Sequence, residues 1–350
     1  MSDAFLPLIH SRVSIDQTYT DSLAYFKENP KLKEQVWDIY WSLHYLWDVV
    51  PQTVETMFSP HTFPAMEANN EFDASVALLL EGFYRQSIVS LRSVLELSLL
   101  SVFYNQDDNG HDNIQAWAHG AENTPFMKTI KKELGLLPYF SEFDTKFTFF
   151  DGLDEIYGIL NDFTHIKGHR HSARGLARRS NTNNFDKSAF ARWLYLAKRV
   201  VKVAVIIHGL RFPLMLKVLP LEDKFGFDIP SGFFLSESQI DQVKKSLTKE
   251  EIAFIEEKAE HDDYTIAVTN DILSRPDMTK AELRKQSLDF NKSMISHSPT
   301  GFKGWYESHS GFYKDSSQEV RDSFEKEAAV LKRWAKRNKC LESHIAQEGI

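Results

Sequence analysis

SVALLLEGFYRQSIVSLRSVLELSLLSVF, residues 75–103, decides the fold of this chain. The stretch is apolar almost all round at helical spacing, which is typical of a helix buried on every side. We therefore expect one long central helix from about Glu71 to Asn105. The charged residues within this helix include Glu81, Arg85, Arg92 and Glu96. Charges at these positions argue against a membrane span and favour a core helix of a bundle.

Helical signals continue on both sides of this central stretch. Further helices are expected at about 30–51, 114–119, 126–135, 144–165 and 185–216. Gly168 is the expected stop signal of the helix over 144–165. Capping boxes predict helix starts at Ser14, Thr248 and Thr279, and Ser236 precedes one more helix.

The composition changes after residue 217. Residues 218–235 resemble a linker, and the chain beyond them is more polar. Residues 298–314, SPTGFKGWYESHSGFYK, are expected to form a loop pinned by its aromatic side chains, with base stacking as the alternative. The sequence predicts an all-α fold, a helical bundle with a long central helix plus a smaller helical C-terminal domain, divided as 1–235 and 236–350.

The cysteine content and the apolar segments indicate a compartment. Cys340 is the single cysteine among 350 residues, which excludes an internal disulfide and a cysteine zinc site within one chain. The first 17 residues lack the pattern of a signal peptide. The apolar stretch 200–216 contains Lys202, His208 and Arg211 and is also expected to be a bundle helix. We expect a cytoplasmic protein with no membrane partner.

Charge is spread unevenly along the chain. Residues 165–217 hold twelve Lys or Arg and one acid, Asp186, so this segment carries +11 in a chain of net charge −8. One interpretation is a surface for phosphate or another polyanion. The alternative is internal compensation, in which the basic segment lies against the acidic remainder.

Two groups of polar residues are candidates for chemistry. Arg92 and Glu96 are four apart on one face of the central helix, and form either a structural pair that fixes bundle register or a charge pair that faces a cleft. Tyr157 and His165 lie on the helix expected over 144–165. A histidine at a helix C-terminus suits general acid–base work near neutral pH, and a capping or packing role is the alternative.

A basic loop follows His165. Its candidate phosphate-binding residues are Lys167, His169, Arg170, His171, Arg174, Arg178 and Arg179. Gly168 and Gly175 would let the backbone approach an anion, and a mobile solvated loop is the alternative. A metal held by the histidines is disfavoured because Gly168 interrupts the helix between His165 and His169. No HExxH, Walker A or Rossmann pattern occurs, and no cofactor is expected.

These motifs together carry a family resemblance. LRSVLE (91–96), followed some sixty residues later by Tyr157-x-x-Leu160-x-x-x-x-His165, resembles bacterial helical proteins of the HEPN type over about residues 70–175. The resemblance implies RNA or nucleotide binding, with Arg92, Glu96 and His165 as the catalytic or polar centre, and a homodimer as one form of assembly. Many proteins of this type resemble ribonucleases and toxin or phage-defence components.

The chain departs from the family pattern at one point. HEPN ribonucleases typically carry Arg, four to six residues and then His on one helix, and the match here is Arg337 to His344, outside the resembling region. This departure favours binding without catalysis over metal-independent RNA cleavage. Whether the chain is an enzyme stays open. The alternative function is a non-enzymatic regulatory protein that docks an acidic partner through its basic face.

Overall fold

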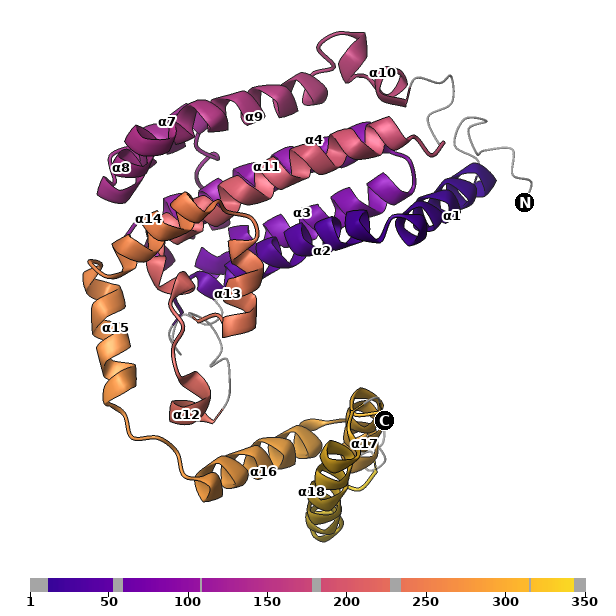
Figure 1. The fold of residues 1–350 in the computed structure, drawn as a ribbon, viewed down its shortest axis with the longest axis vertical. Coiled ribbons are helices and arrows are strands. Elements are labelled where there is room, and N and C mark those ends of the chain that lie inside the picture. Colours follow the sequence, from indigo (N-terminus) through magenta and orange to yellow (C-terminus); the bar gives the residue numbers. More distant parts are fainter. Residues whose placement is uncertain are drawn as a thin grey trace. The chain divides into compact units, whose positions relative to one another are not determined.

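The computed structural model describes residues 12–52, 59–107, 109–177, 184–226, 234–314 and 316–342. All regular structure in these ranges is helical, which confirms the all-α prediction (Figure 1). The chain divides into two compact units. Unit 1 comprises Met1–Leu219 and Ile229–Asp271, and unit 2 comprises Pro220–Asp228 and Ile272–Ile350.

Unit 1 holds most of the helices. They are α1 (Arg12–Glu28), α2 (Pro30–His44), η1 (Tyr45–Val49), η2 (Pro60–Thr62), α3 (Phe63–Leu80), α4 (Tyr84–Tyr104), α5 (Gly110–Asn113), α6 (Gln115–Ala118), α7 (Met127–Leu134), α8 (Pro138–Phe147), α9 (Phe149–Thr164), η3 (His169–His171), α10 (Ala173–Ala177), α11 (Lys187–Arg211), η4 (Pro213–Leu216), α13 (Glu237–Lys244) and α14 (Lys249–Ala259). The last three residues of α15 (Asp263–Ser274) belong to unit 2.

The expected single helix over 71–105 is in fact a helical hairpin of α3 and α4. Gly82, at φ 83°, closes α3, and the Phe83 N–H donates to the Leu78 carbonyl at 2.8 Å. This is a Schellman ending, in which glycine adopts the left-handed conformation without a Cβ clash. The apolar pattern runs through the turn because both helices are buried, so hydropathy alone does not mark the break.

Two serine side chains link the two helices of this hairpin by hydrogen bonds. Ser75 Oγ donates to the Ser87 carbonyl at 2.7 Å, and Ser87 Oγ donates to the Ser75 carbonyl at 2.6 Å. Trp193 Nε1 of α11 donates to Ser75 Oγ at 2.8 Å. Small side chains allow α3 and α4 to approach closely, and all three polar groups are satisfied inside the core.

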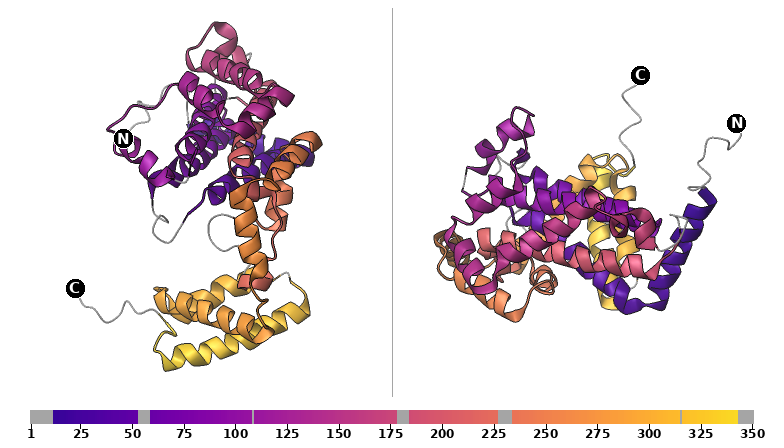
Figure 2. Two further views of the ribbon diagram at one scale, coloured as in Figure 1. Left: turned by 90° about the vertical axis from the view of Figure 1, so that its left-hand side faces the viewer. Right: turned by 90° about the horizontal axis from the view of Figure 1, so that it is seen from above.

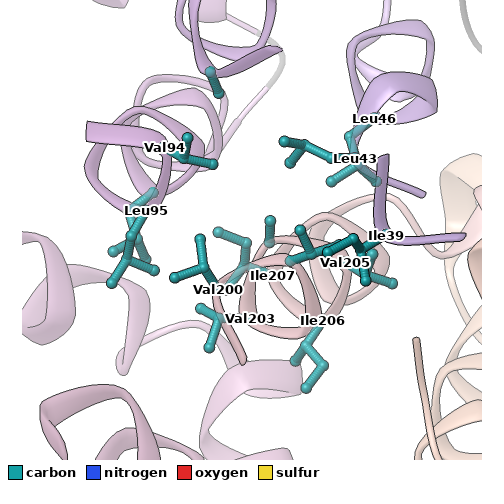
Figure 3. Close-up of a cluster of buried hydrophobic side chains, with 14 of the residues drawn as sticks. Ile39, Leu43, Leu46, Val94, Leu95, Val200, Val203, Val205, Ile206 and Ile207 are labelled. Carbon is teal, nitrogen blue, oxygen red and sulfur yellow. The ribbon is translucent and has the colours of Figure 1, made fainter. Parts of the chain in front are cut away.

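The core of unit 1 forms around α4 and α11. Figure 3 shows Val94 and Leu95 of α4 and Leu43 of α2 gathered around Val200 and Ile207 of α11. These five side chains are at most 2% exposed. Each buried aliphatic side chain of this size contributes about 1.5–3 kcal/mol, so this apolar cluster is the main source of stability.

Within the described residues, α4 alone is long and apolar enough to cross a membrane by length and composition. The buried share of its most apolar window is 61%, and Arg92 and Glu96 pair with each other on its flank. A core helix of a bundle has this character.

The two units divide at a different place from the predicted boundary at 235. Ile240 and Val243 of α13 and Phe254 and Ile255 of α14 are buried in the core of unit 1. The capping boxes at Thr248 and Thr279 are confirmed, and Ser236, which was expected only to precede a helix, also forms a capping box. A capping box marks where a helix begins. It is a local feature and does not predict which core the helix joins. Ser14, by contrast, lies inside α1 rather than at its start.

Unit 2 contains α12 (Leu221–Phe225), α16 (Lys280–His297), α17 (Gly301–Phe312) and α18 (Gln318–Arg337). Figure 2 shows the last three, orange to yellow, packed against one another. Their core includes Ile295, Phe302, Trp305 and Leu331. The expected loop over 298–314 is therefore mostly the helix α17. Its Phe302 and Trp305 pack into a core, whereas Phe312 is 82% exposed.

Candidate functional site

Arg92, Glu96 and Tyr157 form a closed polar triangle between α4 and α9. Arg92 Nε donates to Glu96 Oε1 at 3.0 Å, and Arg92 Nη2 donates to the Tyr157 hydroxyl at 3.2 Å. The Tyr157 hydroxyl in turn donates to Glu96 Oε1 at 3.1 Å. The Arg92 guanidinium also lies 5.4 Å from the centre of the Tyr157 ring. These groups satisfy one another, as in a structural pair that fixes the register of α4 against α9.

The pKa shifts agree with a closed triangle. Burial lowers the pKa of Arg92, but electrostatic attraction to Glu96 and the hydrogen bonds to Glu96 and Tyr157 raise it by more, so the pKa lies above its usual value. Burial, followed by the charge of Glu96, raises the pKa of the Tyr157 hydroxyl. Tyr157 therefore keeps its proton near neutral pH, and Arg92 keeps its charge.

His165 does not join this triangle, contrary to the expectation that Arg92, Glu96 and His165 would converge. It is the exposed residue that follows α9, and helix geometry places it about 12 Å along the axis from Tyr157. No hydrogen bond or ion pair links its side chain to any residue that the structure describes. At this end of α9, Arg85 donates to the carbonyls of Phe163 and Thr164, at 3.1 and 3.0 Å.

The end of α9 is a Schellman motif with an unusual residue at its turn. Ile166, rather than glycine, takes the left-handed position with φ 50°, and the Lys167 N–H donates to the Asp162 carbonyl at 2.9 Å. Gly168, the predicted stop signal, lies two residues further on, at φ 82°. A β-branched residue in this conformation is strained and persists only where its surroundings hold it.

Replacing Ile166 with glycine is expected to raise the free energy of unfolding by up to about 1 kcal/mol. The left-handed conformation costs an L-residue about 1–2 kcal/mol, and glycine loses about 0.5–1 kcal/mol of this gain to chain entropy. Urea denaturation measures the change. Ile166→Val, which keeps the β-branch, should show no gain. A glycine variant less stable than wild type would show that contacts of the half-exposed Ile166 side chain outweigh the strain.

The basic loop after α9 folds into η3 and α10. His171 is buried, with Nδ1 2.5 Å from the Lys167 carbonyl and its ring edge-on to Phe163 at 4.9 Å between centres. Its Nε2 lies 3.8 Å from Asp162 Oδ2, and Lys167 Nζ lies 3.4 Å from Asp162 Oδ1. His171 therefore supports the loop from inside.

Gly175 has the close-packing role expected of a loop glycine, but toward the protein itself. A Cβ at this position would lie 1.9 Å from the His169 carbonyl oxygen. Only glycine lets α10 lie this close to η3. The close approach leaves His169, Arg170 and Arg174 exposed on the outer side of the loop.

A cavity of about 400 Å³ lies between α9, the η3–α10 segment and the first turns of α11. Figure 1 shows these elements at one end of the bundle. The charged and polar side chains that line the cavity are Asp162, Arg170, His171, Ser188 and Arg192. Its apolar wall includes Ile159, Phe163, Leu176 and Ala189. Two arginines at a partly apolar cavity suit a ligand that carries an anionic group on an apolar or aromatic body.

The position of Arg192 follows from the start of α11. Asp186 Oδ1 accepts hydrogen bonds from the N–H groups of Ser188 and Ala189, at 2.9 and 3.0 Å, which fixes the first turn of the helix. The Arg192 guanidinium lies 5.6 Å from the centre of the Tyr195 ring. Arg192 belongs to the +11 segment, but that segment has so many cations that the sequence does not single it out.

The +11 segment has two parts with different surroundings. In its later part Arg199, Lys202 and Lys217 pair with Glu155, Glu251 and Glu260, each at 2.8–2.9 Å. In its earlier part Lys167 pairs with Asp162 at 3.4 Å, but Arg170, Arg174 and Arg192 have no acidic partner among the residues described. Internal compensation thus describes the later part, and an available basic surface describes the earlier one. Arg178 and Arg179 lie outside the described residues, as does His344.

Metal binding has no support in the arrangement of these side chains. Across the described ranges, no group of three or more His, Cys, Asp or Glu side chains is placed to hold a metal ion. His171 and Asp162 approach each other, but His165 and His169 do not join them in such a group.

No family model, no curated protein and no solved structure matches this chain.

Proposed function

We propose that this chain binds a phosphate-bearing ligand, with RNA as the leading class, at the cavity between α9, η3, α10 and α11. The observation that carries the proposal is the pair Arg170 and Arg192, which line one cavity and have no acidic partner in the described part of the chain. Arginine guanidinium groups bind phosphate oxygens in pairs of parallel hydrogen bonds. Arg174 and His169 extend the same basic face toward solvent.

We further propose that the protein acts as a cytoplasmic HEPN-like binding protein, for example in a toxin or phage-defence system. Catalysis is left out of the proposal. A ribonuclease centre would need Arg92 or Glu96 to face a substrate, and both are engaged with Tyr157. His165, the expected acid or base, has no partner to position it within the described ranges.

Replacing Arg170 and Arg192 together with glutamine is expected to weaken RNA binding at least tenfold. The plot of log affinity against log salt for a single strand should lose about 0.7 of slope for each lost phosphate contact, or about 1.4 in all. Fluorescence anisotropy with a short labelled single-stranded RNA, between about 50 and 200 mM salt, measures both quantities.

The matched control removes the same net charge from cations that already have acidic partners. Arg199→Gln with Lys217→Gln should leave the affinity and the salt slope close to wild type. An equal loss in both double variants would contradict the proposal, because net charge alone would then explain binding. Wild-type protein with no RNA affinity would point instead to an acidic protein partner on the same basic face.

A further inference from the structure

The last turns of α18 in unit 2 carry an unusual concentration of positive charge. Between Leu331 and Cys340 the cations are Lys332, Arg333, Lys336, Arg337 and Lys339, with no acid among them. All five are exposed, and none has an acidic partner in the part of the chain that the structure describes. This concentration is separate from the cavity of unit 1 and is not used by the function proposed above.

The charges of α18 are segregated along the helix. Its acids, Glu319, Asp322, Glu325 and Glu327, all lie in the first three turns. Glu325 accepts from the Tyr306 hydroxyl at 2.8 Å, and Glu327 accepts from Asn291 Nδ2 at 2.9 Å. Two cations of α16 differ from the five, since Lys285 and Lys292 both pair with Asp289, at 2.9 and 2.8 Å. The end of α18 differs from these paired positions in having five cations and no acid.

The end of α18 is also held rigidly. Lys339 is in the left-handed conformation at φ 58°, and the Cys340 N–H donates to the Ala335 carbonyl at 3.0 Å, which makes a Schellman ending without glycine. The N–H groups of Phe302 and Lys303 in α17 donate to the carbonyls of Cys340 and Leu341, at 2.9 and 3.1 Å. The cations therefore project from a backbone that is fixed on both sides of the turn.

From this arrangement we propose that the end of α18 is a second binding surface, for the phosphate backbone of a nucleic acid. The surface consists of Lys332, Arg333, Lys336, Arg337 and Lys339, and we call it the α18 patch. Residues four apart on a helix lie on one side, so Lys332 with Lys336 and Arg333 with Arg337 form two parallel rows, with about 6 Å of rise between the two residues of each row. A repeating anion can contact both rows, whereas a single phosphate can contact only part of one.

The chemistry of the α18 patch favours a nucleic acid over a protein or a membrane. A protein interface needs an apolar centre and is depleted in lysine, whereas nucleic-acid interfaces are polar and strongly positive. Membrane-surface helices need apolar side chains to insert beside the cations. Of the apolar residues in this segment, Leu331, Ala335 and Cys340 are at most 1% exposed and lie in the core of unit 2. Trp334 is partly buried and packs against the same core.

The test compares two double variants of the full chain. Arg333→Gln with Arg337→Gln removes two cations of the α18 patch, and Lys285→Gln with Lys292→Gln removes two paired cations of the same unit. The probe is a labelled single-stranded RNA long enough to contact more than one surface. The first variant is expected to lose about 1.4 of salt slope and several-fold affinity, and the second to lose neither.

Several results would overturn the inference. Equal losses of RNA affinity in the two variants would assign the effect to net charge. Unchanged RNA binding in Arg333→Gln with Arg337→Gln would show that the α18 patch does not bind RNA. Loss of binding to phosphatidylserine vesicles without loss of RNA binding would assign the α18 patch to a membrane. The variant Arg170→Gln with Arg192→Gln is measured in parallel. If that variant binds RNA like wild type, the function proposed for unit 1 fails, and the result for the α18 patch of unit 2 still stands by itself.

Discussion

Replacing Trp193 with alanine is expected to lower the free energy of unfolding by about 3–5 kcal/mol. Trp193 is fully buried, and its ring packs at 6.0 Å from Phe72 and 6.3 Å from Phe190. The substitution opens a cavity at the junction of α3, α4 and α11 and removes the donor that Ser75 Oγ accepts from. A loss of this size is a large fraction of the 5–15 kcal/mol that ordinarily stabilises a domain.

Thermal and urea denaturation followed by circular dichroism measure this loss. Trp37→Ala is the matched control, because the same atoms are removed from a side chain that is 56% exposed on α2. That control should change the stability by less than about 1 kcal/mol. Similar losses in both variants would show that Trp193 has no special place in the core.

Lowering the pH from 7 to 4 is expected to reduce stability by about 3 kcal/mol through His208 alone. Burial lowers the pKa of this fully buried imidazole to about 4, although a hydrogen bond to the Ala204 carbonyl acts in the opposite direction. Nδ1 lies 2.8 Å from that carbonyl and must carry the proton, so Nε2 accepts from Ser101 Oγ at 3.2 Å. The native core therefore holds a neutral imidazole.

The direction follows from proton uptake in the two states. The unfolded imidazole gains a proton near pH 6.5, and the folded one only near pH 4, so between these values the unfolded state binds more protons. The stability contributed by neutral His208 is complete above pH 6.5 and is lost as the pH falls to 4. Asp48 acts with the opposite sign, because burial raises its pKa to about 6 and the folded state then binds more protons between pH 4 and 6.

Urea unfolding at a series of pH values separates these two contributions. The stability difference between wild type and His208→Gln should shift by about 3 kcal/mol between pH 7 and 4, because glutamine does not titrate. Asp48→Asn should shift the corresponding difference in the other direction. A His208→Gln variant whose pH dependence parallels that of wild type would contradict the assignment of a buried, neutral His208.

Local signals in the sequence predicted where several helices begin, and tertiary packing decided the rest of the fold. Ser236, Thr248 and Thr279 cap helices as expected, because a capping box needs only residues within one turn. The hairpin of α3 and α4 was missed because Gly82 lies between two buried helices and the apolar pattern does not change there. The unit boundary was missed because Phe254 and Ile255 join the first core from a polar stretch of chain.

The candidate site was predicted in part. The pairing of Arg92 with Glu96 depends on helical spacing alone and is confirmed by their 2.9 Å ion pair. The position of His165 depends on how α9 lies against α4. The end of α9 meets the start of α4 at Arg85, so His165 is far from Arg92. Nothing within the sequence of either helix fixes that direction. The role of Arg192 likewise appears only when α11 is placed beside η3 and α10.

The composition of unit 2 from two separate stretches of chain has a consequence for synthesis. The Met278 N–H donates to the Asp223 carbonyl at 2.7 Å, and Lys224 Nζ reaches the Arg275 carbonyl at 2.6 Å and Asp277 at 2.7 Å. On the ribosome α12 emerges some fifty residues before these partners. Asp223 and Lys224 therefore stay exposed to water while α13 and α14 pack into the core of unit 1. Unit 2 is completed only late in translation. A chain released before residue 275 would lack these partners of α12.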